Sequence, residues 1–289
     1  MSGQPPARAT PTATRIGHPR LHLRRTGSTN ERARELAFAG APHGTLVTAG
    51  EQTAGRGRQG RRWSAPAGSS LLASLLLRDV PTLLPLIAAV AVCDVAGEQA
   101  RIKWPNDIVI ESASTGLDAP TDAEADAPAA ASAGIAVAGA GLGKLAGILV
   151  EGRPQEGWAV LGIGLNVAVR LEELPAELRP GSDGHAPSGA VLPAGTLGLT
   201  PADVEPTLAR LLDALEHRLQ EPAEETLQAW RARDALRGRE IAWGTHGADE
   251  RLGRGRAEGI DGTGRLVVTL ADGGRTTIGA GEVHLRELA

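Results

Sequence analysis

Apolar positions along the chain recur with two different spacings, and these predict a mixture of strands and helices. Short apolar runs predict strands over 44–52, 69–78 and 101–110. A Pro-Asn-Asp turn interrupts the last of them. Apolar residues three and four positions apart predict helices that begin near Ser28 and Pro81. Because Ser28 and Glu31 have the spacing of a capping box, we expect their side chains to close the first turn of that helix.

The second half of the chain continues this mixture around a segment of different composition. Residues 111–142 contain twelve alanines, five acidic residues and no basic residue, which predicts a mostly disordered insertion between two strands of a hairpin. Strands are predicted again at 144–152 and 158–169, followed by amphipathic helices between 201 and 236. After Gly238, short strands separated by Asp-Gly and Gly-Gly turns predict a small β-barrel.

Composition and charge narrow the range of partners and compartments. The chain has 289 residues, 42% of them hydrophobic, which is enough for a sizeable core. A net charge of −4 argues against a nucleic-acid partner, because proteins that bind the phosphate backbone are usually basic. Cys93 is the single cysteine, which excludes an internal disulfide and suits the cytoplasm. No apolar run is long enough to span a membrane, and residues 1–20 predict a disordered tail rather than a signal peptide.

The stretch GEQTAGRGRQGRRW, residues 50–63, is the strongest candidate for a ligand site. Its second half places four arginines among the glycines at 55, 57 and 60 and ends on a tryptophan. Glycine lets a backbone turn sharply or approach a ligand closely, and the guanidinium group binds phosphate and carboxylate through paired donors. Such a cluster of cations repels itself unless an anion lies within it. We therefore expect the loop to bind an anionic ligand.

Other motifs that superficially suggest nucleotide or metal sites are excluded by their context. The GRGRQG pattern at 55–60 is not followed by the helix that a dinucleotide site requires. The segment GAGLGK at 139–144 lacks the first glycine and the final Ser or Thr of a phosphate-binding loop. His18 and His22 are four apart, but Pro19 prevents a helical metal pair, so no metal site built from His or Cys is predicted.

Five segments, taken in order, resemble the biotin–protein ligases, in the form that has no N-terminal DNA-binding domain. They are STN at 28–30, EQTAGRGRQGRRW at 51–63, KWPND at 103–107, KLAGILVE at 144–151 and GIGLNV at 162–167. The resemblance implies an α+β fold with a mixed-sheet catalytic domain of the biotin/lipoate ligase type, like that of class II synthetases. It places this domain at 21–236, with the insertion at 111–142, and a C-terminal SH3-like β-barrel at 237–289.

The same resemblance implies an ATP-dependent ligase. Biotin's carboxylate attacks the α-phosphate of ATP to give biotinyl-5′-AMP and pyrophosphate, and a lysine of a biotin carboxyl carrier domain then displaces AMP. The implied cofactors are ATP, biotin and Mg²⁺, and the implied partner is the carrier domain of acyl-CoA carboxylases. We expect neither DNA nor a membrane as partner, and either a monomer or a homodimer. A lipoate–protein ligase is the alternative, although GRGRQGR and KWPND favour biotin.

The matching motifs also imply roles for individual residues. The catalytic residues expected are Lys144, Arg58 and Asp107, with Mg²⁺ entering on ATP and lying near Asp107. The residues expected to bind biotin are Ser28, Thr29, Asn30, Gln52, Gly55, Arg56, Arg58, Lys144, Gly147 and Gly162. Those expected to bind ATP are Arg56, Arg58, Arg61, Trp63 and Asn166. Glycine within the apolar strand at 162–166 is expected to let the backbone come close to the biotin ring.

Overall fold

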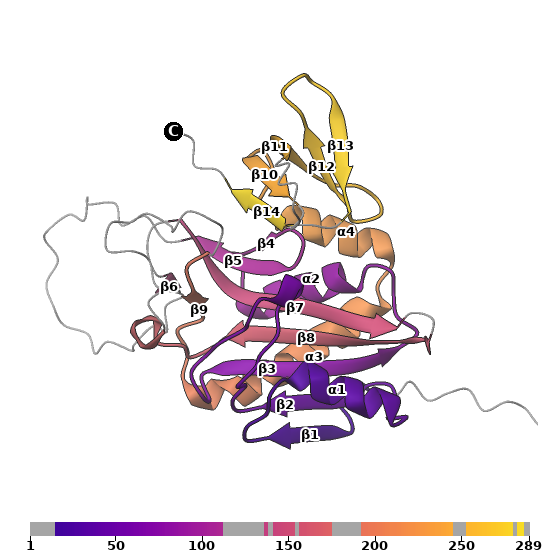
Figure 1. The fold of residues 1–289 in the computed structure, drawn as a ribbon, viewed down its shortest axis with the longest axis vertical. Coiled ribbons are helices and arrows are strands. Elements are labelled where there is room, and N and C mark those ends of the chain that lie inside the picture. Colours follow the sequence, from indigo (N-terminus) through magenta and orange to yellow (C-terminus); the bar gives the residue numbers. More distant parts are fainter. Residues whose placement is uncertain are drawn as a thin grey trace, which may run out of the picture.

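A mixed sheet forms the centre of the larger part of the molecule (Figure 1). The computed structural model describes residues 15–111, 136–137, 141–153, 156–174, 192–244, 253–279 and 282–285. The sheet has seven described strands, which lie side by side in the order β1 (Arg20–Leu23), β2 (Leu46–Ala49), β3 (Ser70–Arg78), β8 (Trp158–Asn166), β7 (Leu142–Arg153), β5 (Asp107–Glu111) and β4 (Ala100–Lys103). The pair β1–β2 is parallel and the other pairs are antiparallel.

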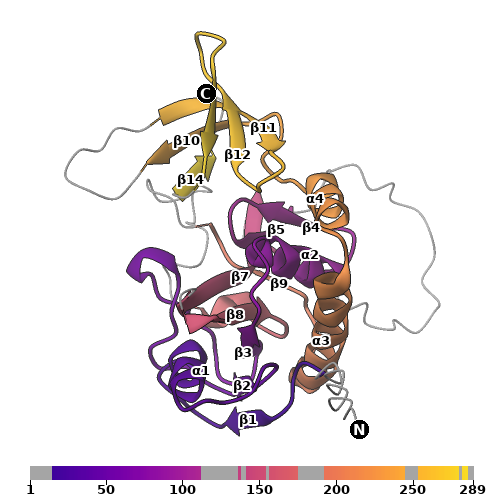
Figure 2. The same cartoon turned by 90° about the vertical axis from the view of Figure 1, so that its right-hand side faces the viewer.

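Helices cover both faces of this sheet (Figure 2). Helix α1 (Thr29–Phe38) lies on one face, where Ala33 packs with Leu76 of β3. Helices α2 (Leu84–Ala96), α3 (Val204–Gln220) and α4 (Ala223–Ala232) lie on the other. Since neighbouring residues of a strand point to opposite faces, Leu75 and Leu77 of β3 belong to the larger core beneath α2. Helix α2 is apolar on all sides because it lies between the sheet and the two later helices.

A second sheet lies beyond α4 and packs onto the larger part. Its antiparallel strands follow the order β13 (Arg275–Ile278), β12 (Leu266–Thr269), β11 (Gly253–Ile260), β10 (Glu240–Gly244) and β14 (Glu282–Leu285). Ile241 and Leu266 belong to the same hydrophobic cluster as α2. The indole Nε1 of Trp104 also donates a hydrogen bond of 3.1 Å to the carbonyl of Gly264. The two sheets therefore share one continuous core.

Several elements agree with the sequence analysis, and others correct it. The α+β class and the strand at 69–78 are confirmed. The turn inside 101–110 is also confirmed, because it separates β4 from β5. The helix expected at Pro81 begins three residues later, at Leu84, with proline in its first turn. The capping box is wrong: Ser28 is the N-cap of α1, but its side chain makes no capping hydrogen bond.

Two segments expected to be disordered contain ordered residues. The tail is described from Arg15 onward, and Ile16 is buried in the large core, which gives this end of the tail an apolar anchor. The backbone N–H of Gly17 donates to the carbonyl of Gly44 at 2.9 Å. Within the insertion, β6 (Ala136–Val137) pairs with β9 (Gly195–Thr196), because a short strand satisfies both backbones. Residues 1–14 and most of the insertion lie outside the described part of the chain.

Candidate active site

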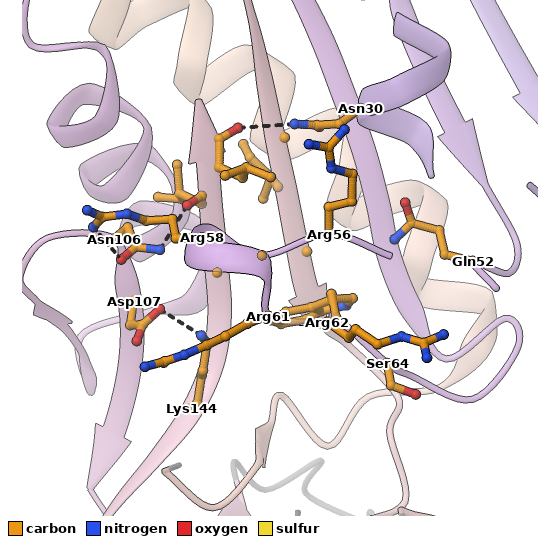
Figure 3. A pocket seen from close by; sticks show the side chains of 18 of the residues that line it. Asn30, Gln52, Arg56, Arg58, Arg61, Arg62, Ser64, Asn106, Asp107 and Lys144 are labelled. Atoms are coloured by element: carbon orange, nitrogen blue, oxygen red, sulfur yellow. Dashed lines mark hydrogen bonds and ion pairs between the residues drawn. The ribbon is translucent and has the colours of Figure 1, made fainter. Parts of the chain in front are cut away.

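A cavity opens on the α1 side of the central sheet (Figure 3). Its volume is about 370 Å³, within the range of small-molecule sites. Of the residues singled out in the sequence, it is lined by Ser28, Thr29, Asn30, Gln52, Arg56, Arg58, Arg61, Trp63, Asp107, Lys144, Gly147, Gly162 and Asn166. Segments spread over more than a hundred positions of sequence thus meet around one space.

Gly55 is the predicted residue that does not line the cavity; it shapes the arginine loop instead. Its carbonyl accepts a hydrogen bond of 3.0 Å from the backbone N–H of Trp63, and a Cβ at this position would lie 2.4 Å from the carbonyl oxygen of Trp63. A backbone bridge between Arg56 and Arg62 lies next to this contact. Glycine is therefore required here so that the two ends of the loop can approach each other.

Side chains of the arginine loop contact partners on distant elements. Arg56 Nη2 lies 2.8 Å from Glu151 Oε1 on β7, and Arg58 Nη1 donates to Asn106 Oδ1 at 3.2 Å. Burial lowers the pKa of the Arg58 guanidinium, although the nearby Asp107 carboxylate opposes this shift. These contacts hold the loop over the cavity, as Figure 3 shows for Arg58 and Asn106.

Two lysines and one aspartate meet at the end of the cavity near β4 and β5. Lys144 Nζ lies 2.7 Å from Asp107 Oδ1, and their side chains are 29% and 14% exposed. The two residues reach each other because β5 and β7 are paired strands. Lys103, at the end of β4, is buried and lines the same cavity, and burial lowers its pKa. Trp63 places its ring centroid 5.8 Å from Lys144 Nζ.

The opposite end of the cavity is lined by uncharged polar side chains, with Arg56 beside them (Figure 3). Gln52 Oε1 accepts hydrogen bonds from the backbone N–H and the hydroxyl of Thr29, at 2.7 and 3.0 Å. Ser74 Oγ lies 2.8 Å from Thr29 Oγ1 and 2.6 Å from Asn30 Oδ1. The hydroxyl of Ser28 is buried and has no hydrogen-bond partner among the described residues. An unpaired buried hydroxyl is costly, so a polar ligand at this end would satisfy it.

The glycines of the GIGLN strand make room for two side chains of the protein. A Cβ at Gly162 would lie 2.1 Å from Asn30 Oδ1, and a Cβ at Gly164 would lie 2.6 Å from Trp63 Cε2. Gly147 is opposite Gly164 on the neighbouring strand, and a Cβ there would lie 3.1 Å from Trp63 Cζ3. This explains why glycines interrupt an otherwise apolar strand: they form a flat floor on which Asn30 and Trp63 lie.

Asn166 lines the cavity, but its side chain is bound within the protein. Its amide Nδ2 donates to the carbonyl of Gly195 at 2.9 Å, and its Oδ1 accepts from the hydroxyl of Ser70 at 3.2 Å. Among the described residues, no cluster of three or more His, Cys, Asp or Glu side chains could hold a metal ion.

Sequence reasoning missed several polar residues of the site. Lys103 and Asn106 belong to the KWPND segment and line the cavity, but only Asp107 was chosen from it. The chain contains two lysines, Lys103 and Lys144, and this scarcity could have identified Lys103 as a candidate residue of the site. Glu151 had no comparable signal, because its partners are distant in sequence.

Comparison with known proteins agrees with this geometry. Residues 22–167 match the Biotin/lipoate A/B protein ligase family. Residues 238–286 match the Biotin protein ligase C terminal domain. The chain belongs to the biotin/lipoate A/B protein ligase family.

The following relatives match more than half of this chain. The Biotin--[acetyl-CoA-carboxylase] ligase of Mycobacterium tuberculosis is 34% identical over 90% of this chain and 87% of its own length. The ligase of the same name from Paracoccus denitrificans is 32% identical over 90% of this chain and 98% of its own. The Bifunctional ligase/repressor BirA of Bacillus subtilis is 45% identical over 53% of this chain, and the match spans 41% of that relative.

Solved structures support the fold. A biotin protein ligase from Aquifex aeolicus, in complex with biotin and ATP, superposes with a TM-score of 0.66 at 22% identity and covers 93% of this chain and 99% of its own. Its likeness extends over both sheets, and the C-terminal sheet domain is SH3-like, as expected. Within the described residues, no helix combines the length and apolar character needed to cross a bilayer.

Proposed function

We propose that this family member joins biotin to a lysine of a biotin carboxyl carrier domain in an ATP-dependent reaction through biotinyl-5′-AMP. Relatives at 34% and 32% identity over 90% of the chain bear the name Biotin--[acetyl-CoA-carboxylase] ligase. The observation that carries the proposal is the cavity itself, which has an uncharged polar end at Thr29 and Gln52 and a cationic end at Lys144. A neutral ureido ring and an anionic tail require this polarity.

In the first step a biotin carboxylate oxygen attacks the α-phosphorus of ATP, and the bond from that phosphorus to the bridging oxygen of pyrophosphate breaks. Two anions must come into contact, so the site must supply fixed positive charge. Arg56 and Arg58 project from the loop toward the cavity and are suited to the carboxylate and the phosphates, while Arg61 is suited to the outer phosphates. We propose that Lys144 contacts the α-phosphate after its Nζ turns away from the Asp107 carboxylate, to which it is now paired.

In the second step the amine of the carrier lysine attacks the acyl carbon of the mixed anhydride. The carbon–oxygen bond to the phosphate breaks, AMP leaves, and the amine loses a proton as the amide forms. Asp107 can accept a hydrogen bond from the incoming amine when Lys144 turns to the phosphate. The arginine loop, which borders the cavity, would shield the anhydride from water.

Mg²⁺ would enter with ATP, as it commonly binds substrate phosphates with one or two protein carboxylates. Asp107 is the single carboxylate among the described lining residues, which fits such a partial protein contribution. When bound, the ion would neutralise charge on the polyphosphate.

The remaining expectations on this chain stay proposals. We propose the residue roles given above, a domain boundary near 236–237, and the carrier domain of an acyl-CoA carboxylase as partner, and we keep a cytoplasmic monomer or homodimer as the expected state. Lipoate is the competing substrate. The uncharged polar end favours biotin, because the dithiolane ring of lipoate carries no amide to pair with Thr29 or Gln52.

The test is exchange of labelled pyrophosphate into ATP in the presence of biotin, lipoate or neither. Exchange that depends on biotin supports the proposal, and exchange that depends on lipoate alone contradicts it. A second assay follows transfer of biotin to a purified carrier domain and to a carrier variant whose acceptor lysine is replaced by arginine. Label on the first and none on the second is the expected result.

A further inference from the structure

Glu151 connects the arginine loop to helix α1 from outside the cavity. It lies near the end of β7, and its side chain is 19% exposed. The residue is absent from the described lining of the cavity, although both of its close partners, Arg56 and Asn30, line it. A carboxylate at this position influences a bound ligand through those two partners, because it does not itself line the cavity.

Each oxygen of this carboxylate has its own partner. Oε1 lies 2.8 Å from Arg56 Nη2, and Oε2 accepts a hydrogen bond of 3.0 Å from Asn30 Nδ2. Arg34 is more distant, with Nη1 3.9 Å from Oε1. Because the two close contacts are on different oxygens, one rigid side chain fixes the loop and the first turn of α1 relative to each other.

We propose that Glu151 is a positioning residue that holds Arg56 over the cavity and orients the Asn30 amide, and so retains the adenylate. This rests on the proposed ligase function. Arg56 lies on a loop rich in glycine, whose free backbone would otherwise leave the guanidinium mobile. Its Nη2 is bound by Glu151, and within the part of the chain that the structure describes its other side-chain N–H groups remain for a ligand.

Because the ion pair between Arg56 and Glu151 is partly exposed, its effect on ligand retention can be measured apart from its effect on folding stability. The Arg56 side chain is 40% exposed, and exposed ion pairs add little to folding. Replacing Glu151 by glutamine keeps the size of the side chain and removes its charge. We therefore expect E151Q to change the melting temperature little and to affect the retention of biotinyl-5′-AMP strongly.

The experiment measures release of biotinyl-5′-AMP by stopped flow or by filtration in four proteins: wild type, E151Q, R56Q and the double variant. E151Q should speed release about tenfold, equivalent to about 1.4 kcal/mol. In the R56Q background the same change should alter release less than twofold, because residues that act through each other are not additive. R34Q is the matched control, which removes the distant contact of the same carboxylate and should leave release unchanged.

Each outcome either supports or overturns the positioning role of Glu151. Equal effects of E151Q in both backgrounds, or a fall in melting temperature without faster release, overturn the positioning role. An R34Q protein that releases as fast as E151Q overturns the assignment of Arg56 as the relevant partner. Biotin-dependent exchange in the wild type is measured first: its absence refutes the ligase proposal, while normal exchange with an unaffected E151Q protein refutes the positioning role alone.

Discussion

Replacing Gly162 by alanine tests what the glycine floor of the cavity is for. The added Cβ would lie 2.1 Å from Asn30 Oδ1 and 2.9 Å from Asn30 Nδ2. Contacts this short do not occur between a methyl carbon and a fixed polar atom, so the Asn30 side chain must move by about 1 Å in a tightly packed surrounding. The sequence alone assigned the glycine to close approach of biotin, whereas the structure fills this space with Asn30.

The cost follows from what holds Asn30 in place. Ser74 Oγ lies 2.6 Å from its Oδ1, and its Nδ2 donates to Glu151 at 3.0 Å. Overpacking costs about 1–3 kcal/mol. Each hydrogen bond that breaks adds about 1 kcal/mol. The lower end of the overpacking range and one broken hydrogen bond together reduce the free energy of unfolding by about 2 kcal/mol. For a chain of this size, this loss lowers the melting temperature by about 4–8 °C.

The assay is thermal unfolding of the ligand-free protein, together with titration calorimetry of biotin. G262A is the matched control, because a Cβ at Gly262 meets no atom within 4 Å. Shortening Asn30 to serine in the G162A background should remove the overlap and restore much of the melting temperature. An unchanged melting temperature of G162A, with a loss of biotin affinity only, would show that the glycine serves the ligand and would refute the role of Asn30.

Three further variants test the cationic end. K144Q should lower biotin-dependent exchange about 100-fold or more while the protein stays folded, since it removes a donor aimed at developing charge; near-normal exchange contradicts the assignment. R58A should speed release of the adenylate with little change in melting temperature, because a loop side chain contributes more to the ligand than to the core; equal losses in both would count against this. K103M should raise the melting temperature by about 2 °C, because burial disfavours the charged amine and lowers the pKa of Lys103 below 10.5. It should also raise the KM for ATP, because it removes a cation from the lining of the cavity. The unfolded chain then binds more protons, so the excess stability of K103M should shrink as the pH rises toward 10.5, and a constant difference would contradict a lowered pKa of Lys103.

Local patterns were sufficient to predict most of the elements and the set of segments that meet at the site. The run at 69–78 is apolar at most positions because β3 is covered on both faces, by α1 and by α2. The glycines of GIGLN do mark a close approach to the backbone, but the side chains of Asn30 and Trp63 make it where biotin was expected. Sequence reasoning failed where the interaction of a residue depends on segments that are distant in sequence. Ser28 has the capping pattern, yet its hydroxyl is buried beside the cavity without the capping bond.

The pairings of the site could not be derived from the sequence, because they depend on strand register. Lys144 meets Asp107 because β5 and β7 are neighbours with a bulge between Ile108 and Val109. Glu151 meets Arg56 because a loop between β2 and β3 folds back over β7. Neither contact has a periodic signature in one chain, and each joins residues more than thirty positions apart.

The two acids beside the cations differ in what ligand binding does to them. Asp107 lines the cavity and is bound to Lys144, so a phosphate that binds Lys144 competes with this carboxylate for the same ammonium group. Glu151 lies outside the cavity, so Arg56 can keep this partner while it binds a ligand. Arginine suits the second arrangement because its guanidinium has five N–H donors in a plane, while the lysine ammonium is a compact charge that turns from one partner to another. In the proposed mechanism, Lys144 exchanges its partner while Arg56 retains its own, and the exchange leaves Asp107 free for the incoming amine in the second step.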